Sequence, residues 1–97
     1  MSFILTKEEL QRYSKKFLCG LYKMTHSNVN KSVKGIDVFF KHVSSAAYER
    51  PIFGFQATNM IIQELIQKDF IIVGDIEGEV KLTLNGIAKC IEECHRW

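Results

Sequence analysis

The amino-acid sequence predicts a single α+β domain with three helices, a two-stranded hairpin and a C-terminal helix. Three observations support this class. Apolar residues recur at helical spacing in four separate segments of the chain. Two short β-rich runs around a glycine-containing loop lie between the third and fourth of these segments. With 97 residues, the chain has the length of one domain, so we expect residues 1–97 to fold together.

The first helix is expected from about residue 7 to residue 24. Thr6 and Glu9 have the spacing of a capping box, in which the side chain of each residue accepts from the backbone amide of the other. The apolar residues that follow recur at intervals of three and four: Leu10, Tyr13, Phe17, Leu21 and Met24. This spacing predicts one buried face along the helix.

A second helix is expected over about 33–47, after a loop signal at 28–30. Ser32 is a candidate for its N-cap. Its apolar positions again fall on one helical face: Ile36, Phe39, Phe40, Val43 and Ala47.

A turn is expected over 48–54, because Pro51 disfavours helical geometry at Arg50 and Gly54 follows three residues later. The third helix is then expected over 55–68. Its inward positions are Ala57, Ile61, Ile62, Leu65 and Ile66.

The hairpin is expected to have strands at 70–73 and 80–83 and a loop at 74–78. Thr83 can cap the last helix. Helical spacing continues from there almost to Trp97, with apolar positions at Leu84, Ile87, Ala88, Ile91 and Cys94.

Four short runs carry a resemblance to a known family. They are Gln56-Ala-Thr58, Ile61-Ile-Gln-Glu-Leu65, Lys68-Asp-Phe-Ile71 and Lys81-Leu-Thr-Leu-Asn-Gly86. Together they resemble the small winged helix-turn-helix transcriptional regulators of bacteria and archaea, including the MarR-like group. The resemblance covers about residues 55–91. It implies that helix 55–68 enters the major groove of double-stranded DNA and that the hairpin is the wing.

The hairpin loop departs from that family. A wing that grips DNA usually carries Arg or Lys at its tip, whereas residues 74–79 contain three carboxylates and no cation before Lys81. Such charges would repel phosphates. Either the wing points away from DNA, or the protein is a winged-helix adaptor that binds another protein and not DNA.

Four carboxamides fall on one side of the third helix, away from Ile61 and Leu65. They belong to Gln56, Asn59, Gln63 and Gln67. Amides can pair with adenine N6 and N7 in the major groove, so this row is a candidate base-reading surface. The alternative is a merely solvated helix face.

Phosphate contacts are expected from Thr58, near the predicted start of the third helix, and from Arg50 and Lys34 in the flanking segments. The basic residues of the first helix are more typical of a solvated face. They are Lys7, Arg12, Lys15, Lys16 and Lys23.

Three cysteines, an odd number, favour reduced thiols in a reducing compartment. Cys90 and Cys94 lie four residues apart beside His95, which would suit a thiol or metal sensor. Only one such pair is present, and Cys94 also belongs to the apolar face of its helix. Buried apolar cysteine is therefore the favoured interpretation, and we expect no metal and no cofactor.

The remaining expectations concern activity, location and assembly. The sequence has no phosphate-binding glycine loop, no His-Glu-x-x-His and no nucleophile-elbow pattern, so we expect no enzyme and no catalytic residues. A net charge of +2 neither demands nor excludes DNA. We expect a cytoplasmic protein without a membrane span. An apolar end at Trp97 and the family resemblance favour a homodimer through the first and last helices.

Overall fold

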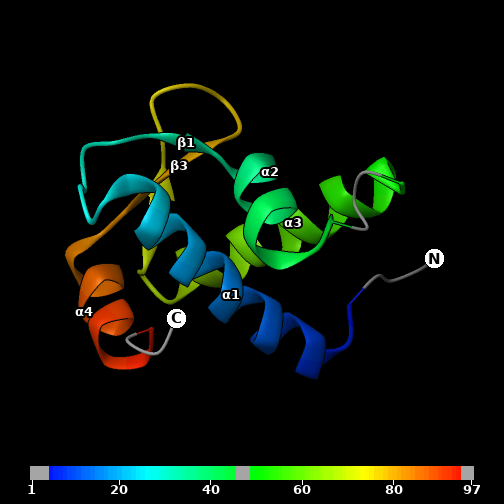
Figure 1. Cartoon of the computed structure of the whole chain (residues 1–97), viewed down its shortest axis with the longest axis horizontal. Helices are drawn as coiled ribbons and strands as arrows, with labels where there is room; N and C mark the ends of the chain where they lie inside the picture. Colours follow the sequence, from blue (N-terminus) through cyan, green and yellow to red (C-terminus); the bar gives the residue numbers. More distant parts are fainter. Residues whose placement is uncertain (1–4, 46–48, 95–97) are drawn as a thin grey trace.

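The computed structural model describes residues 5–45 and 49–94. In this part of the chain, four α-helices and one π-helix pack around a three-stranded antiparallel sheet, so the α+β class is confirmed. The arrangement is compatible with a winged helix (Figure 1). The elements are α1 (Lys7–Thr25), β1 (Val33–Lys34), α2 (Gly35–Val38), the π-helix η1 (Phe39–Val43), α3 (Pro51–Gln67), β2 (Ile71–Val73), β3 (Glu79–Leu82) and α4 (Leu84–Glu93).

Helix α1 begins and ends as its sequence predicts. The Glu9 amide donates to the Thr6 hydroxyl at 3.1 Å, and the Thr6 amide donates to the Glu9 carboxylate at 3.0 Å, which completes the capping box. The helix stops at His26, whose φ of 53° lies in the left-handed region. Phe17 and Leu21 are fully buried, so the predicted apolar face is the face that packs on the core.

The prediction of a continuous second helix over 33–47 is wrong. Val33 and Lys34 instead form strand β1, because they pair with β3, and the helix that follows is interrupted by η1. Ser32 does not cap it: its hydroxyl accepts from the Asp75 amide at 2.9 Å. Ala47 lies outside the described residues.

Helix α3 begins at Pro51, so the turn expected over 48–54 is wrong from that residue onward. Arg50 is non-helical, as expected, with a φ of −133°. Proline is common at the first position of a helix, because the backbone N–H that it lacks would have no partner within the helix there. Pro51 therefore starts the helix, whereas we expected it to belong to a turn. The helix ends at Gln67, within one residue of the predicted end.

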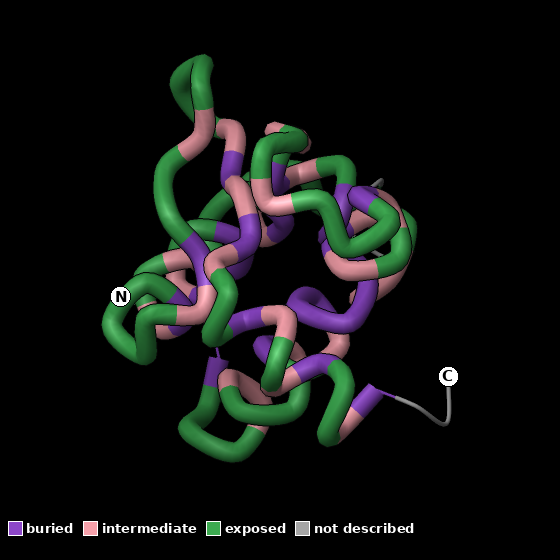
Figure 2. Tube along the Cα trace, turned by 90° about the vertical axis from the view of Figure 1, so that its left-hand side faces the viewer, coloured by how far each residue is buried: buried purple, intermediate pink, exposed green. Residues whose placement is uncertain are grey.

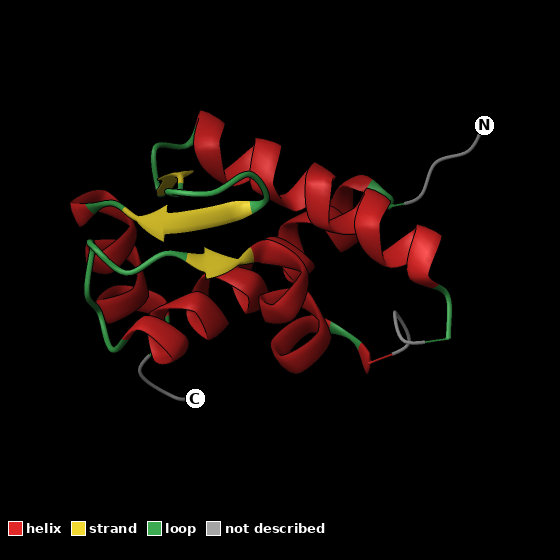
Figure 3. Cartoon of the chain, turned by 90° about the horizontal axis from the view of Figure 1, so that it is seen from above, coloured by secondary structure: helices red, strands yellow, loops and turns green. Residues whose placement is uncertain are grey.

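The predicted hairpin is confirmed, and β1 adds a third strand to it. The strand order is β1-β3-β2, with Val33 opposite Val80 and Val80 opposite Val73 (Figure 3). The connecting residues 74–78, here called the wing loop, turn through Gly78, whose φ is +87°. The Gly78 carbonyl accepts from the Gly35 amide at 2.9 Å, which ties the wing loop to the start of α2.

Thr83 and Gly86, in the run Lys81-Leu-Thr-Leu-Asn-Gly86, shape the start of α4. The Thr83 hydroxyl accepts from the Gly86 amide at 2.9 Å, as predicted for an N-cap. The same hydroxyl donates to the Asp69 carbonyl at 2.7 Å. A Cβ at position 86 would collide with the Phe70 carbonyl oxygen, so only glycine lets α4 approach the end of α3 this closely.

The core lies between α1, α3 and the sheet, where the buried positions of the chain meet (Figure 2). A disulfide between Cys19 and Cys94 joins α1 to the end of α4, with a Cα–Cα distance of 5.7 Å. The expectation of three unpaired cysteines is therefore wrong, because residues 75 apart in sequence meet in the fold. Helix α4 ends at Glu93, and Trp97 lies outside the described residues. None of the described helices has the length and apolarity needed to cross a membrane.

Candidate nucleic-acid interface

The four predicted carboxamides form an exposed row along α3. Gln56, Asn59, Gln63 and Gln67, here called the amide row, are all exposed. Ala57, Ile61 and Leu65 point into the core on the opposite side. Neither the wing loop nor another described segment covers the row, so a large ligand can reach it.

The exposed side of α3 carries amides and apolar groups but no cation. No Lys or Arg lies between Pro51 and Gln67, and the one carboxylate in this range, Glu64, pairs with Lys68 at 2.9 Å. Ile52 and Phe55 are 73 % and 57 % exposed, although both are large and apolar. The surface therefore offers hydrogen bonds and apolar contact, and little electrostatic attraction of its own.

A pocket of about 210 Å³ lies between α3, the start of α2 and the wing loop. We call it the α3–wing pocket. Its lining residues are Lys34, Ile36, Phe55, Thr58, Asn59, Ile62, Glu77 and Gly78. The pocket brings one member of the amide row together with one cation and one anion from distant parts of the chain.

Thr58 is not the surface phosphate ligand that we expected. It is the eighth residue of α3, not a residue near its start, because the helix begins at Pro51. The side chain is only 4 % exposed, and its hydroxyl has no hydrogen-bond partner among the described residues. Thr58 lines the α3–wing pocket and does not lie on the open surface of α3.

The two expected cations lie apart, Arg50 at the start of α3 and Lys34 in the α3–wing pocket. Arg50 is exposed just before α3, and its guanidinium carbon lies 5.1 Å from the centre of the Phe53 ring. Lys34 is exposed at the end of β1 and lines the α3–wing pocket with Asn59. Both positions suit contacts that flank a base-reading helix, since phosphate contacts orient a protein on the duplex.

The wing carboxylates do not all turn away from α3. Asp75 is paired with Lys81 at 2.8 Å, which neutralises it locally. Glu77 lines the α3–wing pocket beside Asn59 and Phe55. A carboxylate therefore stands next to the amide row, where it would repel phosphates and attract a cation.

Phe55 and Glu77 are the residues of this surface that sequence reasoning did not select. Phe55 precedes Asn59 by four residues and Ile62 by seven, so helical spacing places the three together. The signal for Phe55 was thus present. For Glu77, long-range hydrogen bonds from Gly35 to Gly78 and from Asp75 to Ser32 hold the wing loop beside the start of α2, and no local pattern reveals them.

The outer face of α4 is apolar. Leu84 and Ile91 are 76 % and 62 % exposed and lie seven residues apart, with exposed Ala88 between them. Helix α1 shows no exposed large apolar side chain among the described residues. An apolar surface is therefore available on the last helix but not on the first.

Cys90, the third cysteine, has an unreactive thiol. Burial, and to a smaller extent the charge of Glu93, raises the pKa of the Cys90 thiol to about 12, so the group stays protonated. Its Sγ donates to the Leu18 carbonyl at 3.7 Å. Among residues 5–45 and 49–94, no three His, Cys, Asp or Glu side chains are grouped so that they could hold a metal ion.

Comparisons with models of known protein families, with curated proteins and with solved structures find no match to this chain. The resemblance to winged-helix regulators therefore rests on the sequence runs and on the compatible arrangement of helices and strands.

Proposed function

We propose that the protein is a sequence-specific DNA-binding transcriptional regulator that inserts α3 into the major groove. The observation that carries this proposal is the exposed amide row, which no described segment of the chain covers. An α-helix fits the major groove, and carboxamides pair bidentately with adenine there. A three-stranded sheet beside the helix is compatible with the winged-helix arrangement in which such helices read DNA.

Within this proposal, Asn59 and Gln63 read base edges near the middle of the contact. Gln56 and Gln67 extend the same row toward the two ends of α3. Arg50 and Lys34 bind phosphates on either side and set the register of the helix in the groove. With so few cations at the surface, specificity comes mainly from hydrogen bonds to bases.

The apolar face of α4 supports a homodimer as part of the same proposal. Pairing Leu84 and Ile91 with their copies across a two-fold axis would remove both from water. Two α3 helices would then contact half-sites about 34–36 Å apart, one turn of the duplex. As a regulator of bacterial or archaeal type, the protein would act in the cytoplasm.

Selection from a random duplex library, followed by fluorescence anisotropy over about 50 to 200 mM salt, tests this function. We expect a recurrent motif and binding that weakens with salt, with a slope that reflects only a few phosphate contacts. Gln11 is an exposed glutamine on α1, outside the proposed contact. Gln11→Ala is therefore a control and should bind DNA like the wild type. Absence of binding at the lowest salt concentration would remove the proposal.

A protein-interaction adaptor is the second candidate, and a specific observation favours it. Ile52 and Phe55 expose apolar area on α3, and Glu77 adds a negative charge beside them. Aromatic side chains on an exposed surface are typical anchors of protein interfaces. A pull-down with the wild type and with Phe55→Ala tests this candidate. A stoichiometric partner that DNA does not displace, and that Phe55→Ala loses, would favour the adaptor.

A further inference from the structure

The charged groups of the α3–wing pocket make no ion pair within the described part of the chain. Lys34 and Glu77 both line the pocket, yet neither forms an ion pair with the other or with another described residue. Asn59 adds a side-chain amide to the same lining. The pocket therefore presents a cation, an anion and an amide to whatever enters it.

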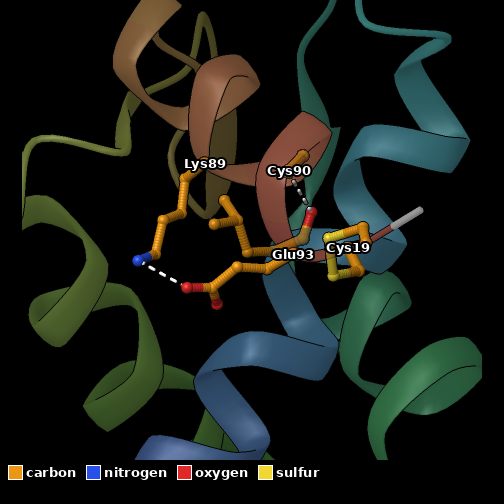
Figure 4. Close-up of a disulfide and its surroundings, with 6 residues drawn as sticks. Cys19, Lys89, Cys90 and Glu93 are labelled. Carbon is orange, nitrogen blue, oxygen red and sulfur yellow. Dashed lines mark hydrogen bonds and ion pairs between the residues drawn. A yellow bond between two sulfur atoms is a disulfide. The ribbon is translucent and has the colours of Figure 1, made fainter. Parts of the chain in front are cut away.

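A second pocket differs in this respect. It has a volume of about 220 Å³ and lies between α1, α4 and the segment that follows α3. Lys89 pairs there with Glu93 at 2.6 Å (Figure 4), and Lys68 pairs with Glu64 at 2.9 Å. A charged ligand of the second pocket would have to compete with these ion pairs, whereas a ligand of the α3–wing pocket would not.

The backbone holds the two charged residues of the α3–wing pocket on joined segments. Lys34 and Glu77 immediately precede Gly35 and Gly78, and the Gly35 amide donates to the Gly78 carbonyl at 2.9 Å. The cation and the anion are therefore kept in one region of the molecule without neutralising each other. A ligand that carries both charges can engage both residues.

Three other lining residues are apolar. Phe55 and Ile62 belong to α3, and Ile36 belongs to α2. Phe55 is 57 % exposed and the two isoleucines are half-buried, so a ligand that covers them removes apolar area from water. The pocket volume of about 210 Å³ is below the roughly 300–1,000 Å³ of sites for drug-sized ligands, which indicates a small ligand.

We propose that the α3–wing pocket is a binding site for zwitterionic α-amino acids with a small aliphatic side chain, such as valine. The ammonium group of the ligand binds the Glu77 carboxylate, and its carboxylate binds the Lys34 ammonium group. The aliphatic side chain contacts Phe55 and the two isoleucines. The Asn59 amide serves either charged group of the ligand, because it has both a donor and an acceptor.

The charges of the pocket also exclude ligands of a single sign. An anion would be attracted by Lys34 but repelled by Glu77, and a cation would meet the reverse. Either ligand would leave one charged group of the protein without a partner. A zwitterion satisfies both groups, so it should bind more tightly than an anion or a cation of the same shape.

Binding of the amino acid does not depend on the proposed DNA function, but its consequence rests on that function. Asn59 belongs to both the amide row and the pocket, and Lys34 is a proposed phosphate contact. An amino acid in the pocket would engage both residues and should therefore weaken DNA binding. The ligand would then be an effector of the proposed regulator.

NMR titration of the ¹⁵N-labelled full-length protein with L-valine, without DNA, tests the site. We expect saturable shift changes at the pocket residues, with a dissociation constant of about 1 mM. Valinamide lacks the carboxylate and 3-methylbutanoate lacks the ammonium group, and both keep the shape of valine. Each should bind about tenfold more weakly, because one contact between charged groups is lost.

Two variants assign the contacts through the ligand that each affects. Glu77→Gln should weaken valine binding about tenfold but should not weaken 3-methylbutanoate binding, because that ligand has no ammonium group. Lys34→Gln should weaken valine binding similarly but should not weaken valinamide binding. Asp37→Asn and Lys31→Gln are the matched controls, since both residues are exposed and neither lines the pocket.

Absence of saturable shift changes at valine concentrations up to about 10 mM would overturn the proposal. Equal affinities of the wild type for valine, valinamide and 3-methylbutanoate would also overturn it. So would variants that weaken all three ligands alike, because the charges would then not distinguish the two ends of the ligand.

Fluorescence anisotropy with a selected duplex tests the consequence separately. Valine should raise the dissociation constant for DNA in the wild type, but not in Glu77→Gln at a valine concentration that no longer fills the pocket. Failure to bind DNA even without valine would refute the proposed function and leave the amino-acid site standing. Valine binding with unchanged DNA affinity would refute the effector role alone.

Discussion

The two pockets have almost the same volume, about 210 Å³ beside α3 and about 220 Å³ between α1, α4 and the segment that follows α3, but they are lined by different charged groups. The α3–wing pocket is lined by one lysine and one glutamate. The pocket between α1 and α4 is lined by three lysines, Lys15, Lys68 and Lys89, and by Glu93. Two of these lysines are paired, Lys68 with Glu64 and Lys89 with Glu93, so most of the positive charge of the second pocket is compensated.

This difference explains how a net charge of +2 can accompany a surface suited to reading bases. The groups that would recognise bases are neutral amides, and only Arg50 and Lys34 flank them. Phosphate neutralisation lowers the logarithm of the binding constant by about 0.9 per contact for each unit of log salt. The proposed DNA complex should therefore depend on salt only weakly for each protomer.

The largest expected effect lies at the α1–α4 end. Reducing the disulfide removes a cross-link between residues 75 apart, which in the chain-entropy description costs about 4 kcal/mol of unfolding free energy. Urea unfolding with and without a phosphine reductant measures the loss. Cys94→Ser should show the lower stability in both conditions. A wild-type midpoint that does not respond to reductant would contradict the cross-link.

Gly86→Ala should weaken the junction through which α3 meets the sheet and α4. The added methyl group collides with the Phe70 carbonyl oxygen, and such overpacking costs about 1–3 kcal/mol. Asn85→Ala is the neighbouring control: it loses one exposed 2.7 Å hydrogen bond to Asp69, a smaller cost. Thermal unfolding of the two variants should rank them in that order, and equal stabilities would refute the close approach.

The exposed apolar residues of α4, Leu84 and Ile91, are the proposed dimer contact. Ile91→Glu places a charge in the proposed dimer contact and removes an apolar side chain that the contact would bury. It should therefore raise the dimer dissociation constant at least about tenfold. Analytical ultracentrifugation gives the constant. Glu92→Gln, also exposed on α4, is the control. A wild type that is monomeric at all concentrations would exclude the homodimer.

Glu77→Gln should distinguish the two proposed functions by the sign of its effect, although the effect is small. Removing a carboxylate beside the amide row should tighten DNA binding about twofold, because one partly screened repulsion disappears. If the protein is an adaptor for a cationic partner, Glu77→Gln should instead weaken the binding of that partner. Glu8→Gln, exposed on α1, is the control. Tighter DNA binding by Glu8→Gln as well would attribute the gain to net charge alone.

Local chemistry made part of this fold predictable. The Thr6–Glu9 capping box, the Thr83 cap and the hairpin each depend on residues close in sequence, and all three are confirmed. Strand β1 was missed because its two residues become extended only by pairing with a strand more than forty residues later. The disulfide was missed for the same reason, since neither cysteine has a local signal that identifies its partner.

The candidate site shows the same division. Helical spacing placed the amide row on the exposed side of α3, and all four residues are exposed there. Thr58 was misplaced because the helix starts four residues earlier than expected, so a residue assigned to the first turn is buried in the middle. Glu77 reaches α3 through the fold of the wing loop, which spacing along the chain does not reveal.

The central claim is that the amide row reads bases, and Gln63→Ala tests it most directly. The measurement is the ratio of affinities for a selected duplex and for the same duplex with each adenine position replaced in turn. The account predicts that Gln63→Ala loses about 1–3 kcal/mol of discrimination at one position and leaves non-specific binding unchanged. Undiminished discrimination at every position, by Gln63→Ala and by Asn59→Ala, would show that α3 does not read the sequence.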